Sequence, residues 1–373
     1  LEGDARDPRS WSGTPSYRSR ALENHWAGVS YIGPVEPRIL PVLNKLARLQ
    51  RRWTGINLLP SQSPLALRAY GRILGRALAE HRPQAVIAPA GSALVAALET
   101  DLPVIYSSDA TVRVMLGYYG HFSDLSPATL ARVEALEQRA IDRADLLLYP
   151  TAWAAQSAID DYGADPGKVH ILPYGANMRE LPGADAALRP RLPGPLRLLF
   201  VGVDWVRKGG PIAVAALAAL RRGGVEAQMT VVGCIPPPDV SREGLTVIPF
   251  LDKNDPGQAR HLSRLYGDAD LLFVPTRSEC YGIVFCEAAA HGVPSISTAT
   301  GGVPGVILEG VTGHLLPPEA DGAAYAELIA RVAASPDAPD GPLARLARSA
   351  RADYDARLNW ERWAAQATAL VTA

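Results

Sequence analysis

Cysteine and lysine are scarce in this chain of 373 residues. The spacing of the three cysteines fits neither a metal site nor a disulfide framework, which favours a reducing cytoplasm; they are Cys234, Cys280 and Cys286. Nearly all basic residues are arginine, and the lysines are Lys45, Lys168, Lys208 and Lys253. Long apolar runs are also absent: none approaches the roughly 18 residues of a membrane span, and no signal-peptide pattern opens the sequence. The formal net charge of −1 gives no electrostatic reason to expect nucleic-acid binding.

The length of the chain is sufficient for two domains, each with a sizeable core. Short apolar runs alternate with helical stretches, which predicts an α/β fold with parallel sheets and helices on both faces. The predicted strands are residues 29–33, 85–88, 104–107, 146–149 and 169–172 in the first half, and 196–201, 229–232, 245–250, 271–274 and 295–297 in the second. A doubly wound domain normally opens with a strand, whereas a helix near Gly13 comes first here. We therefore expect the first strand to be missing from the N-terminus.

Two features divide the chain into similar halves. Residues 179–195 contain Leu-Pro-Gly, Arg-Pro and Leu-Pro-Gly-Pro, which predicts a linker. The sequence Ala-Asp-Leu-Leu-Leu-Tyr-Pro-Thr at residues 144–151 recurs as Ala-Asp-Leu-Leu-Phe-Val-Pro-Thr at residues 269–276. The predicted parts of the chain are an N-terminal domain at 1–178, the linker, a C-terminal domain at 196–356 and a C-terminal helix within 357–373.

Residues 278–292 have the pattern of a ligand site. The buried strand predicted at 271–274 leads into a loop with Glu279, Gly282 stands at the turn, and an apolar run up to Gly292 predicts a helix. Open α/β sheets bind ligands beyond the carboxyl ends of their strands, where a helix N-terminus offers free N–H groups and a partial positive charge. A glycine at the turn removes the side chain that would block a phosphate. The stretch therefore predicts a phosphate-binding site.

The acidic residues Glu279 and Glu287 indicate a second kind of ligand group. A carboxylate accepts two directional hydrogen bonds, which suits the hydroxyls of a sugar or a ribose. Two acids beside a phosphate site would repel the phosphate unless each reached for a neutral diol. The phosphate site and the two glutamates together predict a nucleotide sugar.

The same residues resemble a known family. Glu279 and Glu287, within Ser-Glu-x-Tyr-Gly-Ile-Val-x-x-Glu-Ala, resemble the paired-glutamate motif of glycosyltransferase family 4, with Cys280 where the family usually has a glycine. The resemblance implies the GT-B architecture: two Rossmann-like domains that face each other across a cleft, with the C-terminal helix crossing back to the first. It also implies retaining, metal-independent transfer of a hexosyl unit from a nucleotide diphosphate sugar to a hydroxyl acceptor, such as a lipid, a glycan or a metabolite, with no cofactor required. We expect a UDP-sugar first and a GDP-sugar second.

A second glycine-rich loop, residues 201–210, follows a predicted strand and opens a helix. Arg207 and Lys208 supply positive charge beside two glycines, which suits a diphosphate whose charge develops as it departs. An ordinary strand–helix loop is the alternative. In the family this position usually reads Gly-Arg and then Lys-Gly; Lys208 matches, and Val203 stands in place of the arginine.

The N-terminal domain contains two further candidates. Gly13 opens a helix whose N–H groups would reach the phosphates from the other domain; alternatively, Ser12 is a simple N-cap of that helix. Asp109 follows the strand at 104–107, near the place where many family members have a histidine. It would orient the acceptor hydroxyl or bind the donor sugar, or it caps a helix that begins near Thr111. Nucleophilic attack by Asp109 is a third alternative.

The resemblance implies several other donor contacts. The backbone of Phe250 and Leu251 would pair with the base edge, and the Gly-Gly-Val-Pro sequence at residues 301–304 would shape the floor of the cleft. An ordinary loop and a turn with an N1 proline are the alternatives. The remaining contacts are expected from Tyr281, Gly282, Ile283 and Val284.

Three other patterns are interpreted as structural. Asp268 and Asp270 superficially resemble a metal site, which we reject because the equivalent sequence at residues 143–145 also leads into a strand. His291 lies at a predicted helix end, where a cation is favoured. Cys280 and Cys286 are interpreted as packing residues.

Residues 38–53 predict a basic amphipathic helix. Its apolar face consists of Ile39, Val42, Leu43, Leu46, Leu49 and Trp53, and the basic side chains avoid that face. One interpretation is docking to an anionic membrane or to the acceptor, which would place a cytoplasmic protein at the inner membrane face. The other is a solvated surface helix packed on its sheet.

Two other functions remain open. A nucleotide-sugar epimerase of the same architecture would need acid/base side chains in the cleft and would not release free nucleotide. A non-catalytic protein that binds a sugar nucleotide or a glycan is also compatible with Val203 and Asp109, the two departures from the family pattern. Hydrolysis of the donor in the absence of acceptor distinguishes an enzyme from such a binding protein.

Overall fold

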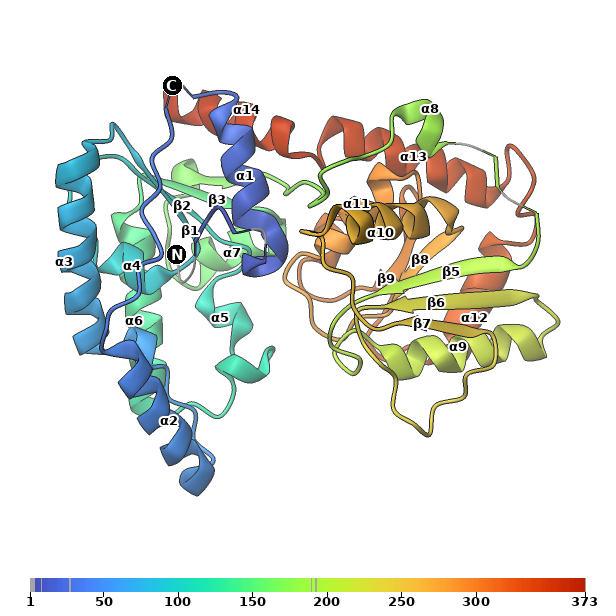
Figure 1. The fold of residues 1–373 in the computed structure, drawn as a ribbon, viewed down its shortest axis with the longest axis horizontal. Coiled ribbons are helices and arrows are strands. Elements are labelled where there is room, and N and C mark those ends of the chain that lie inside the picture. Colours follow the sequence, from blue (N-terminus) through green and yellow to red (C-terminus); the bar gives the residue numbers. More distant parts are fainter. Residues whose placement is uncertain (1–3, 8, 27, 189, 192, 373) are drawn as a thin grey trace. The chain divides into compact units, whose positions relative to one another are not determined.

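The computed structural model describes residues 4–7, 9–26, 28–188, 190–191 and 193–372 (Figure 1). The chain forms two compact units. The first contains residues 1–172 and 366–373, and the second contains residues 173–365.

The predicted linker, residues 179–195, groups with the second unit and includes a short helix, α8 (Ala184–Ala187). Its residues Arg189 and Leu192 lie outside the described part of the chain. The domain boundaries inferred from the sequence stay a prediction.

The first unit is built on a four-stranded parallel sheet. Its strands are β1 (Val86–Pro89), β2 (Val104–Ser107), β3 (Leu146–Tyr149) and β4 (Val169–Ile171), and they lie side by side in that order. Its helices are α1 (Thr14–Glu23), α2 (Leu40–Thr54), α3 (Pro64–His81), α4 (Ser92–Ala96), α5 (Val112–Met115), α6 (Pro127–Arg143) and α7 (Ala152–Asp160), with 3-10 turns at Ser10–Gly13, Pro60–Gln62, Gly120–Phe122 and Pro166–Lys168. Four of the five strands predicted in the first half are thus confirmed to within one residue.

The strand predicted at residues 29–33 was wrong. The described residues 28–37 are irregular and belong to no ladder. Ile32 packs partly against the core and Val35 is buried, so apolar side chains do anchor the segment. A strand also requires a neighbouring edge that accepts its N–H and C=O groups, and apolar composition alone does not supply one.

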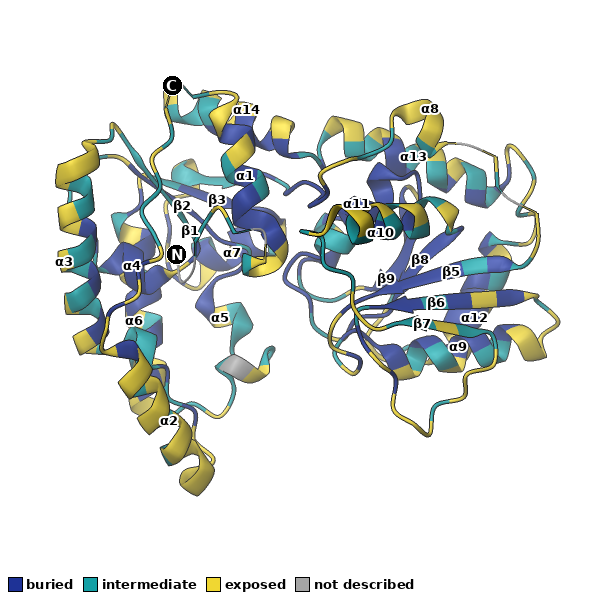
Figure 2. Cartoon of the chain, in the orientation of Figure 1, coloured by how far each residue is buried: buried dark blue, intermediate teal, exposed yellow. Residues whose placement is uncertain are grey.

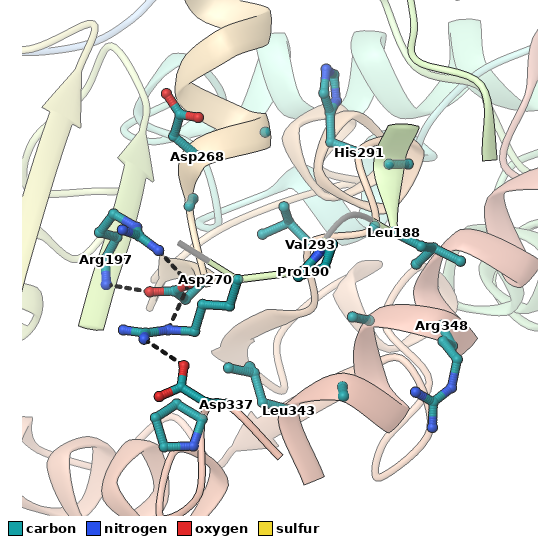
Figure 3. A pocket seen from close by; sticks show the side chains of 18 of the residues that line it. Leu188, Pro190, Arg197, Asp268, Asp270, His291, Val293, Asp337, Leu343 and Arg348 are labelled. Carbon is teal, nitrogen blue, oxygen red and sulfur yellow. Dashed lines mark hydrogen bonds and ion pairs between the residues drawn. The ribbon is translucent and has the colours of Figure 1, made fainter. Parts of the chain in front are cut away.

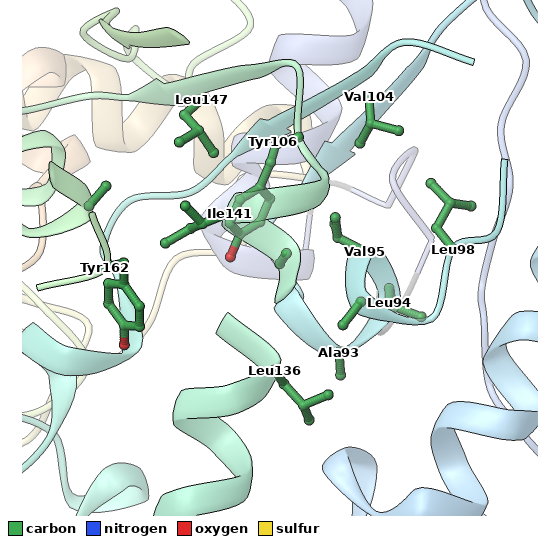
Figure 4. Packing of buried hydrophobic residues seen from close by; sticks show 14 of the residues in the cluster. Ala93, Leu94, Val95, Leu98, Val104, Tyr106, Leu136, Ile141, Leu147 and Tyr162 are labelled. Carbon is green, nitrogen blue, oxygen red and sulfur yellow. The ribbon is translucent and has the colours of Figure 1, made fainter. Parts of the chain in front are cut away.

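The core of the first unit packs strand residues against α4 and α6 (Figure 4). Tyr106 of β2, Leu147 of β3 and Ile141 of α6 lie at its centre. One acid is buried with them: Glu137 accepts long hydrogen bonds, 3.5 Å to each carboxylate oxygen, from the hydroxyl of Tyr106. Burial raises the pKa of Glu137 to about 7, because the charged form loses its hydration.

The second unit is a doubly wound sheet of six parallel strands. The strands are β5 (Leu196–Val201), β6 (Ala227–Val232), β7 (Leu245–Ile248), β8 (Leu271–Val274), β9 (Ser295–Thr298) and β10 (Gly313–Leu316), in the order β10-β9-β8-β5-β6-β7. The helices are α9 (Gly210–Arg222), α10 (Pro256–Asp268), α11 (Ile283–Ala290), α12 (Gly322–Val332), α13 (Pro342–Ala356) and α14 (Trp360–Thr372), with a 3-10 turn at Val303–Gly305. All five predicted strands are present, and β10 is an additional edge strand.

The order of these strands reverses between β5 and β8. Chain order runs outward from β5 to β6 and β7 on one side, and from β8 to β9 and β10 on the other. Such a reversal is the switch point at which open α/β sheets bind ligands beyond the carboxyl ends of the strands. Figure 2 shows that the strands on both sides of this point are largely buried.

The aspartates of the repeated Ala-Asp sequence, Asp145 and Asp270, make the same hydrogen bonds in the two units. Asp145 accepts a hydrogen bond from the N–H of Val104 at 2.7 Å, and Asp270 accepts one from the N–H of Arg197 at 2.7 Å. The N–H of each aspartate donates back to the carbonyl oxygen of the same partner at 2.8 Å. Each aspartate therefore fastens the start of its strand to the neighbouring strand. This role explains the repeat without a metal.

A cavity of about 360 Å³ lies beside Asp270 (Figure 3). Residues at the amino ends of β5 and β8 line this cavity. It therefore lies at the edge of the sheet opposite the switch-point loops. Nε of Arg191 lies 3.0 Å from Asp270, and its Nη1 lies 3.0 Å from Asp337. These ion pairs hold together the segments that line the cavity, so we interpret the residues as structural.

Helix α14 begins in the second unit, and its last residues belong to the first. Trp360 stacks on Tyr174 with ring centres 5.4 Å apart and donates to Oδ1 of Asn177 at 2.9 Å. In the first unit, Oγ1 of Thr368 accepts a hydrogen bond from Nε1 of Trp26 at 2.8 Å. The return of the C-terminal helix to the first unit, which the resemblance implied, is confirmed.

Candidate functional site

Two loops at the switch point form the candidate site in the second unit. One follows β5 and carries Arg207 and Lys208; the other follows β8 and carries Glu279 before α11 begins at Ile283. Three hydrogen bonds tie these loops to each other and to the loop after β9. The N–H of Arg277 donates to the carbonyl oxygen of Arg207 at 2.7 Å, Oγ1 of Thr276 donates to the same oxygen at 3.2 Å, and the N–H of Gly302 donates to the carbonyl oxygen of Glu279 at 3.0 Å. The backbone of the site is therefore fixed by contacts between segments far apart in the sequence.

Glu279 lies beside the positive charges of the neighbouring loop. Its carboxylate forms an ion pair with the ammonium group of Lys208, and about nine-tenths of each side chain is buried. Nη1 of Arg207 lies 3.8 Å from the same carboxylate and donates to the carbonyl oxygen of Ser278 at 2.8 Å. The structure thus brings together three of the predicted catalytic residues. An anion placed here would meet two cations and one acid.

Gly282 is the N-cap of α11, with φ of +97°. An ideal Cβ on this residue would lie 2.5 Å from the ring of Phe285. The glycine is therefore required by its left-handed backbone and by internal packing, whereas the sequence analysis assigned it to phosphate access. Within the described residues, no side chain caps the N-terminus of α11. The first N–H groups of the helix, at half-buried Ile283 and Val284, are positioned to attract an anion.

The glycines after Lys208 have a similar explanation. Gly209 has φ of +80°, and a Cβ there would lie 1.9 Å from the carbonyl oxygen of Pro275. A Cβ on Gly210 would lie 2.2 Å from the indole of Trp205. The sequence analysis interpreted both as freeing the backbone for a diphosphate. The structure shows that Gly209 allows this loop to approach the β8 loop closely, which brings Lys208 to Glu279, whereas Gly210 makes room for Trp205 of its own loop.

Glu287 is fully buried on α11 and has partners on both oxygens. Oε1 forms an ion pair with Lys253, and Oε2 accepts a hydrogen bond from the hydroxyl of Tyr266 at 2.8 Å. His291, predicted as a helix-end cation, is buried one turn later, where its Nδ1 lies 2.7 Å from the carbonyl oxygen of Glu287 and its Nε2 lies 2.8 Å from Oγ of Ser263. The imidazole also stacks on Tyr266, with ring centres 5.4 Å apart. These contacts hold Glu287 in one orientation.

Each motif glutamate therefore has its own lysine, which the sequence analysis missed. Lys208 was predicted to bind phosphate and Lys253 was not singled out as a side chain, yet they pair with Glu279 and Glu287. The interpretation that both acids need neutral diols beside a phosphate is incomplete, because the protein itself neutralises them. The scarcity of lysine was the available signal, since two of only four lysines lie in loops of this unit.

The side chains of Tyr281, Cys280 and Cys286 are buried. The hydroxyl of Tyr281 donates to the carbonyl oxygen of Tyr174 at 2.8 Å, and burial raises its pKa well above the ordinary value. Burial also raises the pKa of the Cys286 thiol to about 12, so this cysteine is protonated at neutral pH. The two cysteines are packing residues, as predicted. Only the backbone of Tyr281 is left for a ligand.

Phe250 and Leu251 lie in the loop after β7, which ends two residues earlier than predicted. Phe250 is 62% exposed and Leu251 is half-buried. The same loop continues to Lys253, the partner of Glu287. Their contact with a base stays a prediction.

The first-unit candidates, Gly13 and Asp109, have distinct local structures. Gly13 is the N-cap of α1 with φ of +90°, so the alternative that Ser12 is the N-cap was wrong. Ser12 itself has φ of +56°, and this left-handed run sets the entry into the helix. Asp109 is half-buried two residues after β2, and helix α5 begins at Val112 with Thr111 as N-cap. The roles of Gly13 and Asp109 in a site stay predictions.

Two family models match the chain. "Glycosyl transferase 4-like domain" matches residues 19–175, and "Glycosyl transferases group 1" matches residues 195–335. The matched segments fall on the two units and include Arg207, Lys208 and both motif glutamates. The chain belongs to glycosyltransferase family 4.

Known proteins of this kind are similar to the chain. D-inositol 3-phosphate glycosyltransferase of Corynebacterium glutamicum is 32% identical over 234 residues, which are 58% of this chain and 54% of the relative. The chain spans about half the length of the curated relatives it matches. Among solved structures, sucrose-phosphate synthase of Thermosynechococcus elongatus has a TM-score of 0.62 at 20% identity and covers 85% of this chain and 80% of its own. The Anabaena protein HepE in complex with UDP has a TM-score of 0.55 at 16% identity and covers 95% and 88%. The GT-B fold expected for this family member is confirmed.

Proposed function

We propose that this protein is a retaining glycosyltransferase that moves a hexosyl unit from a nucleotide diphosphate sugar to a hydroxyl acceptor. The observation that carries the proposal is the cluster of Lys208, Arg207 and Glu279 beside the N-terminus of α11, at the switch point of the sheet. Cations, helix N–H groups and a carboxylate are the groups needed to hold a diphosphate and a sugar together.

Departure of the diphosphate is the step that these cations assist. Negative charge develops on the phosphate oxygens as the glycosidic bond breaks. Arg207, Lys208 and the N–H groups of Ile283 and Val284 are fixed in place before that charge appears. They therefore stabilise the transition state more than the intact donor.

Glu279 holds the hydroxyls of the transferred sugar and positions its ring. The ion pair with Lys208 holds this carboxylate in one orientation. Glu287 holds the ribose of the donor. Its Oε1 faces Lys253, so ribose binding requires Lys253 to move aside or to share the oxygen.

The acceptor attacks from the face on which the diphosphate leaves, and a phosphate oxygen takes the proton of its hydroxyl. The configuration at the anomeric carbon is then retained, and no protein base is required. Asp109 would orient the acceptor hydroxyl, and the backbone at Gly13 would add N–H contacts to the phosphates. The backbone of Phe250 and Leu251 would pair with the base.

A UDP-sugar is the preferred donor and a GDP-sugar the second choice. The structural neighbour HepE binds UDP, which makes UDP the first nucleotide to test. The name of the curated relatives makes an inositol phosphate the first acceptor to test, ahead of lipids and glycans. We place the enzyme in the cytoplasm, with peripheral contact at the inner membrane face through residues 38–53. Its three cysteines are buried and their spacing fits no disulfide framework, which supports that compartment.

A thermal-shift screen with UDP, GDP, ADP and TDP tests the donor. A nucleotide at about one hundred times its dissociation constant stabilises the protein by about 2.7 kcal/mol. For a unit the size of residues 173–365, the melting temperature then rises by roughly 5–10 °C. We expect UDP to give the largest shift; four equal shifts would contradict the donor assignment.

Hydrolysis of the UDP-sugar without acceptor tests catalysis. Glu279→Ala removes the group that positions the sugar, and we expect a loss of at least ~100-fold with an unchanged circular-dichroism spectrum. Glu327→Ala, which removes an exposed carboxylate of α12 that forms an ion pair with Arg331, is the matched control and should keep full activity. Undiminished hydrolysis by Glu279→Ala would remove this residue from the mechanism.

A further inference from the structure

Helix α2 has an apolar face that points to solvent. Figure 2 shows the helix mostly exposed and extending away from the sheet of the first unit. The exposed apolar side chains are Val42 (54% exposed), Leu46 (58%), Leu49 (56%) and Trp53 (83%). Residues 42, 46, 49 and 53 recur at spacings of three and four, so they form one continuous stripe.

A different side of α2 faces the protein. Its buried or half-buried residues are Leu40, Leu43, Ala47 and Gln50. Leu40 belongs to the core cluster of the first unit, and Leu43 packs against that cluster. At about 100° per residue, this inner side is centred nearly a third of a turn, about 110°, from the exposed apolar stripe. Packing against the first unit therefore does not explain the stripe.

The same helix has a strong local charge. Between residues 38 and 54 the chain has five basic residues and no acidic one, although its total formal charge is −1. The basic residues are Arg38, Lys45, Arg48, Arg51 and Arg52. In the described part of the chain, no ion pair joins any of them to a carboxylate. The positive charge of α2 is therefore available to a partner outside the chain.

We propose that α2 is a docking surface for an anionic lipid bilayer. The helix would lie in the plane of the interface, with Val42, Leu46 and Leu49 in the acyl boundary, Trp53 at the headgroup level and the basic side chains against the lipid phosphates. A second copy of this chain is a poor occupant of the stripe, because two-fold contact through it would bring like charges together. Among the residues the structure describes, no helix has the length and apolar character needed to cross a bilayer.

This surface involves none of the residues assigned to the donor site. Its test therefore succeeds or fails independently of the proposed transfer reaction. Flotation with vesicles of phosphatidylcholine alone, or of phosphatidylcholine with about 30% phosphatidylglycerol, measures the partitioning. We expect at least ~10-fold tighter binding to the anionic vesicles, and weaker binding in about 0.5 M salt.

Two variants separate the apolar and electrostatic parts. Leu46→Asp/Leu49→Asp should lower binding to anionic vesicles at least ~10-fold, and Arg48→Glu/Arg52→Glu should abolish the preference for anionic lipid. The matched control, Val311→Asp, places an aspartate at an apolar residue of the second unit that is 50% exposed, and it should bind as the wild type does. All substituted side chains are exposed, so the melting temperatures should stay unchanged.

Fluorescence identifies the inserted residue. Brominated lipid in the anionic vesicles should quench part of the tryptophan emission, and Trp53→Phe should remove that part. Equal vesicle binding by Leu46→Asp/Leu49→Asp and the wild type would overturn the proposal. So would a dimer, seen by sedimentation without lipid, that this variant dissociates, because the stripe would then be an interface between copies.

Discussion

Replacing Lys253 by methionine tests whether the second motif glutamate depends on its lysine. Glu287 is fully buried, and its carboxylate oxygens face Lys253 and the hydroxyl of Tyr266. Methionine preserves most of the apolar stem and removes the charge. The buried carboxylate then has a single side-chain hydrogen bond, from Tyr266.

The cost follows from the geometry of the pair. Removing one partner of a buried ion pair costs about 3–5 kcal/mol, because the remaining charge stays buried without compensation. The Lys253 side chain is 24% exposed, and water that reaches the vacated position reduces the expected loss to about 2–3 kcal/mol. For a unit the size of residues 173–365, the melting temperature should fall by roughly 5–10 °C.

A double-variant cycle separates this effect from lost packing. Glu287→Gln in the Lys253→Met background removes the second charge, and replacing both members of a buried pair is often close to neutral. The double variant should therefore recover to within about 1 kcal/mol of the wild type. Thermal unfolding followed by circular dichroism is the assay, with the exposed Lys45→Met as the matched control. A Lys253→Met protein as stable as the wild type, or a double variant without recovery, would refute the reasoning.

Two other substitutions test the buried acid and the glycine packing. Burial raises the pKa of Glu137 to about 7 from an ordinary 4.5. The contribution of the buried, protonated carboxyl to the free energy of unfolding is therefore fully present below about pH 4.5. As the pH rises through 7 this contribution is lost, and the free energy of unfolding falls by roughly 3 kcal/mol. Glu137→Gln should melt higher than the wild type at pH 8 and at nearly the same temperature at pH 4.5; parallel melting curves at both pH values would contradict this. Gly209→Ala and Gly224→Ala both force a Cβ onto a left-handed backbone, with φ of +80° and +83°. On Gly209 the Cβ would lie 1.9 Å from a carbonyl oxygen, whereas on Gly224 it would meet no described atom within 4 Å apart from its chain neighbours. Chemical denaturation should show a loss of about 1 kcal/mol for Gly224→Ala and at least ~3 kcal/mol for Gly209→Ala; equal losses would show that the close approach is absent.

Continuous apolar runs were sufficient to predict most strands. Residues 104–107, 146–149, 196–201 and 271–274 were predicted with the observed bounds, because strands covered on both faces need apolar side chains at every position. Residues 29–33 have a similar composition and form no strand, since no neighbouring edge pairs with them in the described structure. Pairing is a property of two segments, and one segment does not reveal it.

The stripe of α2 shows the same distinction on a helix. Its periodicity predicted the helix, but the apolar face that it predicted as one surface is divided in the structure. Which side of the helix meets the core depends on how the helix packs against the rest of the first unit. The structure places Leu43 against the core and leaves Leu46 exposed. The exposed stripe was therefore visible only after folding.

The sequence by itself determined the local order of the candidate site: a buried strand, a loop with Glu279, a glycine turn and a helix with Glu287. Hydrophobic pattern and backbone preference act over a few neighbouring residues, so these elements can be inferred from the chain alone. The tertiary structure decided which charges meet. Lys208 lies 71 residues before Glu279 and Lys253 lies 34 residues before Glu287, and only the parallel order of β5, β7 and β8 in the sheet brings each lysine to its acid.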